Sequence, residues 1–139
     1  MVQNTDTGSQ FKLFTSSKNW DAARSHCQSF NADLASIKSS KTNHFLTQLT
    51  QKEAWIGGYV SGSAWKWIND ETTISYTNWY TGEPNNWKTG TQNRIQINYK
   101  EVGFWDDLHE GQPRNYICEK LKIGNYIYCR LIFSTKVSH

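Results

Sequence analysis

Two short groups of oxygen-bearing side chains, well separated along the chain, constrain the fold more than any other feature of this sequence. Glu83-Pro84-Asn85 supplies a carboxylate and an amide beside a proline, and Asp106-Asp107 supplies two further carboxylates. Calcium binds about six to eight oxygens from carboxylates, amide carbonyls and water. We therefore expect a fold that closes these two groups on each other around a calcium ion.

Other landmarks follow one another in an order that resembles the C-type lectin domain family. They are a first helix at 19–27, a strand at 33–37, the core motif Trp55-Ile56-Gly57-Gly58 and a closing strand at 115–119. Several motifs in consistent order over residues 11–120 are far more specific than any one of them. The resemblance implies an α+β fold of two helices packed on small antiparallel sheets, with a long calcium-binding loop region. In this family Glu-Pro-Asn marks the subgroup that binds mannose-type sugars.

Composition and length indicate one domain. The chain has 139 residues, of which 37% are hydrophobic and 14% aromatic, enough to fill a core of that size. Residues 1–10 are polar and predict a flexible leader, 11–120 form the lectin-like domain, and 121–139 form an atypical tail. The basic residues are scattered, so we expect no nucleic-acid partner. No apolar run approaches the roughly 18 residues that span a bilayer, so we expect no membrane insertion.

Apolar residues at helical spacing predict two helices. The first covers about 19–30, and the second covers 40–50 with Phe45, Leu46 and Leu49 on its buried face. Each helix follows a serine or asparagine that can cap its first turn.

Strand patterns occupy the second half of the chain. Alternating apolar residues over 95–99 predict one strand, 102–105 predict another, and 116–118 close the sheet. The tail segment 126–133 has high β-propensity and little charge. It would add an edge strand or, if left uncovered, form an adhesive edge, and the sequence favours neither.

The resemblance pairs Cys27 with Cys118. Such a bridge persists outside the cytosol, which predicts a secreted protein. The family usually carries a second bridge across the binding loops, but the corresponding positions hold Arg94 and, near the Glu110-Gly111 turn, no cysteine. Cys129 is left over, either as an unpaired tail thiol or in an intermolecular disulfide.

The resemblance also implies the site residues. In the family, two neighbouring sugar hydroxyls bind the calcium ion while each also donates to a carboxylate and accepts from an amide. The expected metal ligands are Glu83, Asn85, Gln92, Asp106 and Asp107. The expected sugar contacts are Glu83, Asn85, Gln92, Asp106, Trp87 and His109. Pro84 between the first two ligands is expected in the cis form.

Two positions depart from the family pattern, which has Glu where this chain has Gln92 and Asn where it has Asp106. The two exchanges offset each other, because the site keeps one carboxylate and one amide at these positions. The preceding loop is one residue longer than usual, so Asn93 is an alternative to Gln92. We expect a single Ca²⁺ site.

The predicted function is calcium-dependent binding of glycans that carry mannose, N-acetylglucosamine or fucose. The alternative is a lectin-like domain that binds a protein or ice surface without calcium or sugar. We expect no enzyme, because the motifs of serine hydrolases, zinc proteases and phosphate-binding loops do not occur. Weak single-site affinity would favour a homo-oligomer, joined through the tail or Cys129.

Overall fold

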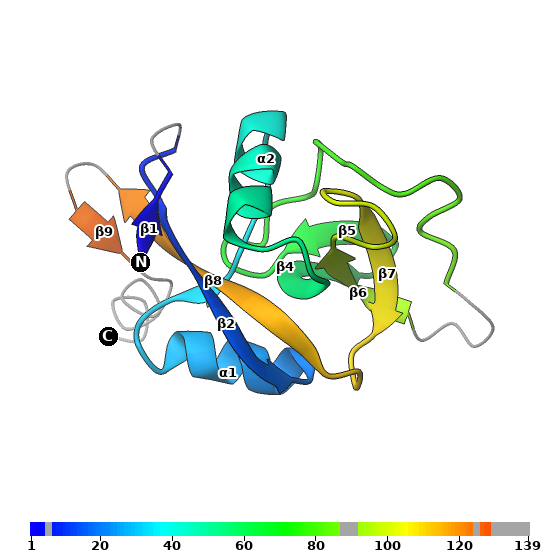
Figure 1. Ribbon diagram of the computed structural model, residues 1–139, viewed down its shortest axis with the longest axis horizontal. Helices are drawn as coiled ribbons and strands as arrows, with labels where there is room; N and C mark the ends of the chain where they lie inside the picture. Colours follow the sequence, from blue (N-terminus) through cyan, green and yellow to red (C-terminus); the bar gives the residue numbers. More distant parts are fainter. Residues whose placement is uncertain (5–6, 87–91, 124–125, 129–139) are drawn as a thin grey trace.

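The structure is a computed structural model that describes residues 1–4, 7–86, 92–123 and 126–128 of the chain (Figure 1). Its elements are β1 (Val2–Gln3), β2 (Gln10–Lys18), α1 (Trp20–Gln28), β3 (Asp33–Leu34), α2 (Ser40–Leu49), β4 (Ala54–Ser61), β5 (Ala64–Trp67), β6 (Gln92–Ile97), β7 (Trp105–His109), β8 (Arg114–Ile123) and β9 (Tyr126–Tyr128). The two described helices and the sheet confirm the predicted α+β class. Neither helix is long and apolar enough to cross a bilayer.

The strands form one mixed sheet rather than separate antiparallel ones. Its order is β1-β2-β8-β4-β6-β7, with β3 and β9 also paired to β8 and β5 paired to β4. β8 runs antiparallel to β2 but parallel to β4, and this parallel pairing joins the two halves of the sheet. Figure 1 shows β2 and β8 as a twisted pair with α1 on one side and α2 on the other.

Both helices begin at the expected caps. Asn19 Oδ1 accepts from the Ala22 N–H at 2.8 Å, and Ser39 Oγ accepts from the Thr42 N–H at 3.2 Å. The buried face of α2 is more polar than predicted, because Asn43 lies on it while Phe45 is only half-buried. The Asn43 side chain is hydrogen-bonded to the Gly103 carbonyl and to the Trp105 indole. Sequence periodicity does not reveal contacts between such distant residues.

The core has two parts. One lies beneath α2 and contains Trp67 and Trp105, and the other packs α1 against the sheet around Trp20. In the second part a disulfide joins Cys27 of α1 to Cys118 of β8, as expected, over a sequence separation of 91. This cross-link fixes α1 to the central strand.

The strand predicted over 102–105 is wrong in its position. β7 begins only at Trp105, and Gly103 before it has a φ of 90°, which strands do not adopt. The Gly103 N–H donates to Asn98 Oδ1 at 2.7 Å, so a turn held by a side chain occupies this segment. Tyr99 also lies beyond the end of β6.

Both ends of the chain add strands to the sheet. In the segment expected to be a flexible leader, β1 pairs with β2, and the buried Asn4 donates from Nδ2 to Thr42 Oγ1 at 3.1 Å. The sequence did not predict this order, because hydrogen bonds of polar residues hold the segment in place and give no hydrophobic pattern. In the tail, β9 pairs with β8, which is the edge-strand alternative as far as the described residues Tyr126–Tyr128 extend. Cys129 lies outside the described residues.

Candidate functional site

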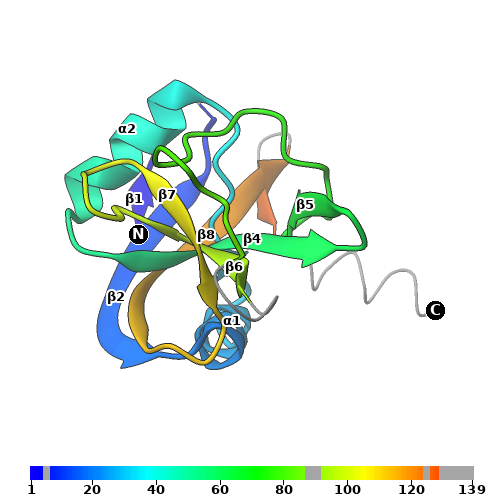
Figure 2. The same ribbon diagram turned by 90° about the vertical axis from the view of Figure 1, so that its right-hand side faces the viewer.

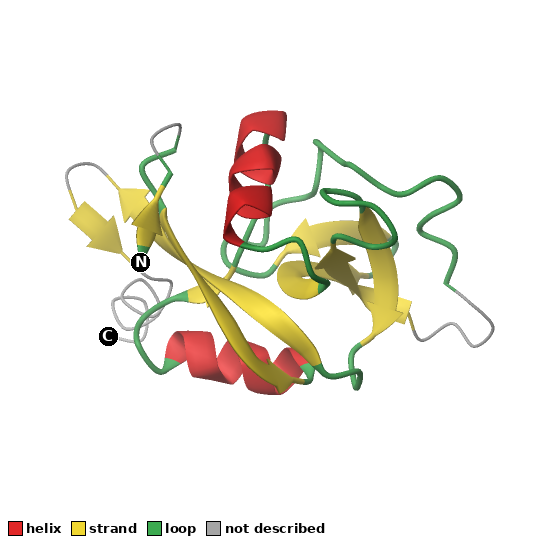
Figure 3. Cartoon of the chain, in the orientation of Figure 1, coloured by secondary structure: helices red, strands yellow, loops and turns green. Residues whose placement is uncertain are grey.

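The long connection after β5 is attached to the start of β7. Trp79 and Trp105 form a parallel bridge, the Tyr80 N–H donates to the Trp105 carbonyl at 2.8 Å, and the Trp105 N–H donates to the Asn78 carbonyl at 2.9 Å. Figures 2 and 3 show this connection, almost entirely loop, running alongside β7. The attachment lies directly before Asp106 in the chain, so it carries Glu83 toward the two aspartates.

Three carboxylates meet where the connection crosses β7. One oxygen each from Glu83, Asp106 and Asp107 lie within 4.8 Å of one another. The two aspartates are buried, with Asp107 fully enclosed. The Glu83-Pro84 peptide bond is cis, as expected. The structure thus brings together the two groups of acids that are separated in sequence.

Each carboxylate has a different set of hydrogen-bond donors. Asp107 accepts from the backbone N–H groups of Asn85 at 3.1 Å and Asn86 at 2.7 Å. Glu83 Oε2 accepts from Asn85 Nδ2 at 3.1 Å. Glu83 Oε1 is buried and accepts no hydrogen bond from a donor among the described residues. Buried oxygens of this kind are normally paired, so Oε1 is suited to a bound cation.

The crowded acids shift one another's proton affinity. Burial, followed by hydrogen bonds to Asp107 and Asp106 and by their charges, raises the pKa of Glu83 to about 8. Burial also raises the pKa of Asp106, although hydrogen bonds with Glu83 and Gln96 oppose the shift. Without a cation the cluster therefore retains a proton near neutral pH. A divalent cation would relieve this repulsion, and the donor set is the oxygen-only type that calcium prefers.

The remaining predicted residues lie at the edge of this cluster. Gln92 is the first residue of β6, its backbone N–H donates to Asn86 Oδ1 at 3.2 Å, and it pairs with His109 of β7. His109 is exposed, and its Nδ1 accepts from the Gly111 N–H at 2.9 Å. Trp87 lies outside the described residues.

A pocket of about 360 Å³ lies beside the acids. It is lined by Gln92 and Asn93 together with Pro84, Asn86 and Asp107 from the site, and by residues of β4 and β5. Asn93 Oδ1 is buried and has no hydrogen-bond partner within the described ranges. Both alternatives for the fifth ligand therefore face the same hollow.

Sequence reasoning missed an ion pair at this end of the sheet. Arg94 Nη2 lies 3.0 Å from Glu110 Oε2, and the guanidinium sits 4.4 Å from the centre of the Trp20 ring. Arg94 and the Glu110-Gly111 turn are the positions at which the resemblance places the second disulfide. The opposite charges of Arg94 and Glu110 at these two positions could have predicted the ion pair from the sequence.

Sequence reasoning also missed Gln96, which lies opposite Asp106 in the β6–β7 register. Gln96 Nε2 donates to Asp106 Oδ2 at 3.1 Å, and Gln96 Oε1 accepts from Arg114 Nε at 2.9 Å. Its position between Ile95 and Ile97, both buried, indicated a side chain on the other face of β6.

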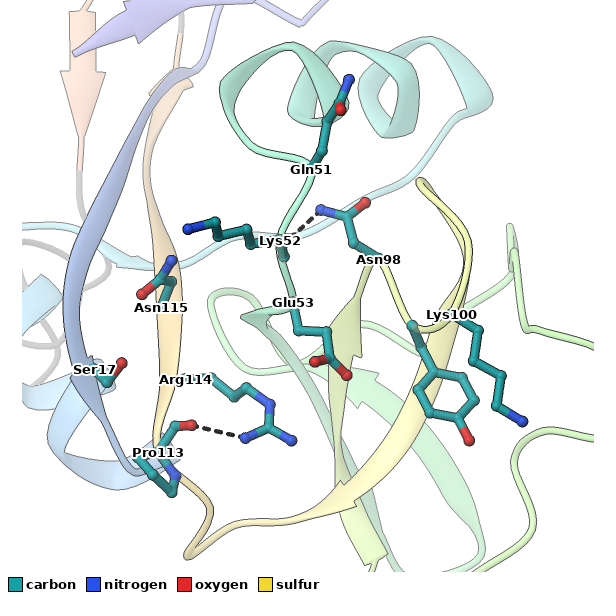
Figure 4. A pocket seen from close by; sticks show the side chains of 10 residues that line it. Ser17, Gln51, Lys52, Glu53, Asn98, Lys100, Pro113, Arg114 and Asn115 are labelled. Carbon is teal, nitrogen blue, oxygen red and sulfur yellow. Dashed lines mark hydrogen bonds between the residues drawn. The ribbon is translucent and has the colours of Figure 1, made fainter.

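Arg114 also lines a second pocket, of about 620 Å³, shown in Figure 4. Lys52, Lys100 and Glu53 surround this open hollow with Arg114, and Arg114 Nη1 donates to the Pro113 carbonyl at 2.8 Å. The mixed charges there do not form a cluster of metal ligands. This pocket is connected to the acids through Arg114, which donates to Gln96, the residue that in turn donates to Asp106.

Comparison with known proteins agrees with this geometry. A family model described as Lectin C-type domain matches residues 16–120. Ladderlectin of Oncorhynchus mykiss is 34% identical over 109 residues, which are 73% of this chain and 56% of ladderlectin. The carbohydrate-recognition domain of the mouse scavenger receptor C-type lectin superposes with a TM-score of 0.76 at 25% identity, covering 88% of this chain and 97% of that one. A calcium-independent type II antifreeze protein superposes with a TM-score of 0.74 at 27% identity, covering 83% of this chain and 88% of that one.

Proposed function

Since this chain belongs to the C-type lectin domain family, we propose that it is a calcium-dependent lectin for mannose-, N-acetylglucosamine- or fucose-type sugars. The observation that carries the proposal is the cluster of Glu83, Asp106 and Asp107, in which Glu83 Oε1 is buried and lacks a partner among the described residues. Glu83-Pro84-Asn85 beside this cluster supports the mannose-type subgroup.

The ligands we propose for a single Ca²⁺ are Glu83, Asn85, Gln92, Asp106 and Asp107. The ion would supply a Lewis acid for two neighbouring sugar hydroxyls and would neutralise the crowded carboxylates. The Asn85 and Asn86 N–H groups hold the Asp107 carboxylate in place by hydrogen bonds. Asn93 Oδ1, for which the described part of the chain offers no hydrogen-bond partner, supports Asn93 as the alternative to Gln92. Trp87 and His109 stay predictions for sugar contact.

Calorimetric titration tests the proposal. Chelator-treated protein is titrated with calcium and then with mannose, and galactose is the control sugar. We expect calcium heat followed by mannose-selective heat. Calcium binding without sugar binding would assign the failure to the exchanges at Gln92 and Asp106. Absence of both signals would overturn the proposal.

A second function, binding of an ice or protein surface without calcium, is favoured by the similarity to the calcium-independent antifreeze protein. The two functions differ in their response to chelator. Thermal hysteresis or protein capture that survives chelation would favour the surface-binding function, whereas sugar binding that chelator abolishes would favour the lectin.

We also propose that the protein is secreted and acts as a homo-oligomer. The Cys27–Cys118 disulfide supports an oxidising compartment, and β9 provides an edge for association. Several copies would raise weak single-site affinity through avidity. Sedimentation as a monomer both with and without reductant would contradict the oligomer.

A further inference from the structure

We infer that Gln96 and Arg114 determine which atom of residue 106 faces the metal site, and that they make a carboxylate necessary there. This inference rests on the proposed function and explains one of its two departures from the family pattern. Neither residue belongs to the expected ligand set. Both act through Asp106 and are positioning residues.

The three side chains form a continuous chain of hydrogen bonds. Arg114 Nε donates to Gln96 Oε1 at 2.9 Å, and Gln96 Nε2 donates to Asp106 Oδ2 at 3.1 Å. Gln96 is 1% exposed and Asp106 is 5% exposed, so water does not readily replace either contact. Each donor in this chain must face an acceptor, because a buried polar group that loses its partner destabilises the fold.

The orientation of the Gln96 amide follows from chemistry. A guanidinium has donors only, so the group that Gln96 turns toward Arg114 must be its oxygen. The NH₂ group of Gln96 then has to point at residue 106, and residue 106 has to present an acceptor to it. Asp106 meets this demand with Oδ2, which leaves Oδ1 for the acid cluster and the ion.

An asparagine at position 106 would meet the same demand differently. Its one oxygen would be turned to Gln96, and its NH₂ group would face Glu83 and the ion. Calcium is bound by oxygen, so that side chain would no longer be a ligand. Asparagine, the family's residue at this position, is therefore incompatible with Gln96, whereas aspartate has an oxygen for each partner.

The test reverses the hydrogen bond in a double variant that keeps the net charge. Asp106→Asn alone removes a proposed ligand and should weaken calcium binding by at least about 100-fold, the upper end of what outer-shell changes produce. Adding Gln96→Glu gives position 96 two acceptors, one for Arg114 and one for the amide of residue 106, and should recover at least about tenfold of the loss. Adding Gln92→Glu instead restores the same charge at the site without turning the amide, and should recover less. Equal recovery in the two double variants would overturn the inference.

A readout without calcium separates this inference from the proposed function. In calcium-free Asp106→Asn protein, NMR should place the side-chain amide protons of residue 106 close to Glu83. With Gln96→Glu added, the same protons should lie close to residue 96. Amide protons that already lie beside residue 96 in the single variant would overturn the inference, even if the wild-type protein binds calcium. Wild-type protein that takes up no calcium would instead overturn the proposed function alone.

Discussion

Arg94 of β6 and Glu110, the residue after β7, form an ion pair at the open end of the β6–β7 hairpin, with 3.0 Å between Nη2 and Oε2. The family resemblance places a disulfide at these positions. Here a non-covalent contact joins the same two strands, and stacking of Arg94 on Trp20 extends it to α1. The strands that carry the site are therefore connected by electrostatics at the place where the family usually carries a disulfide.

Because an ion pair connects these strands, the stability of the protein should depend on salt concentration. Arg94→Gln should lower the free energy of unfolding by about 1 kcal/mol through loss of the ion pair and the stacking. A double-mutant cycle with Glu110→Gln should give a coupling below about 1 kcal/mol that shrinks in high salt. Urea unfolding at low and high salt measures both quantities. Coupling that is unaffected by salt would contradict the electrostatic origin.

Glu83→Gln should separate stability from function. The Glu83 carboxyl has to take up a proton on folding near neutral pH, and glutamine does not, so the calcium-free variant should unfold at a higher temperature there. Calcium affinity should fall by at least about 100-fold, the upper end of what outer-shell changes produce. Glu53→Gln makes the same substitution at an exposed carboxyl on the rim of the Figure 4 pocket and is the matched control. A calcium-free protein that is destabilised by Glu83→Gln would argue against repulsion in the cluster.

The raised pKa of Glu83 predicts a stability that depends on pH. In the unfolded chain this carboxyl has a pKa of about 4.3, whereas its pKa is about 8 in the calcium-free fold. Between these values the native state binds more protons than the unfolded state, so calcium-free stability should fall as pH rises through this window. Thermal unfolding in chelator across the window checks this, and Glu83→Gln should flatten the dependence.

Calcium binding should show the opposite pH dependence, because its carboxylate ligands must be deprotonated. Affinity should fall with decreasing pH, and binding near neutral pH should release protons. Calorimetry in buffers of different ionisation enthalpy measures this release. Affinity that is unchanged from neutral pH down to about pH 4 would contradict carboxylate ligation.

Asn43 should stabilise both the fold and the site. It accepts from Trp105 Nε1 at 2.8 Å and donates to the Gly103 carbonyl at 2.9 Å, which fixes the start of β7 to α2. Asn43→Ala leaves the buried Trp105 indole N–H unpaired and should lower the free energy of unfolding by about 1–3 kcal/mol. The Gly103 carbonyl still accepts from Asn78 Nδ2 at 2.7 Å. Calcium affinity should also fall, because Trp105 precedes Asp106. His44→Ala on the exposed side of α2 is the control and should change stability by no more than about 0.5 kcal/mol.

The elements that were predicted well are those with strong local patterns. Both helices, with their Asn19 and Ser39 caps, follow from residues close together in sequence. The segment before Trp105 was predicted wrongly, because its turn depends on a hydrogen bond from the Gly103 N–H to Asn98. Apolar content alone cannot distinguish such a turn from a short strand.

The sequence by itself determined the family, and the family resemblance implied the Cys27–Cys118 pair that the structure contains. It also supplied the three acids that the fold brings together. The family follows from residue types in a fixed order. Only the tertiary structure decided which atoms meet: Gln96 against Asp106, Arg94 against Glu110, and Glu83 Oε1 without a partner among the described residues. Hydrogen bonds and ion pairs are short and directional, so their partners are set by packing between segments that sequence periodicity does not relate.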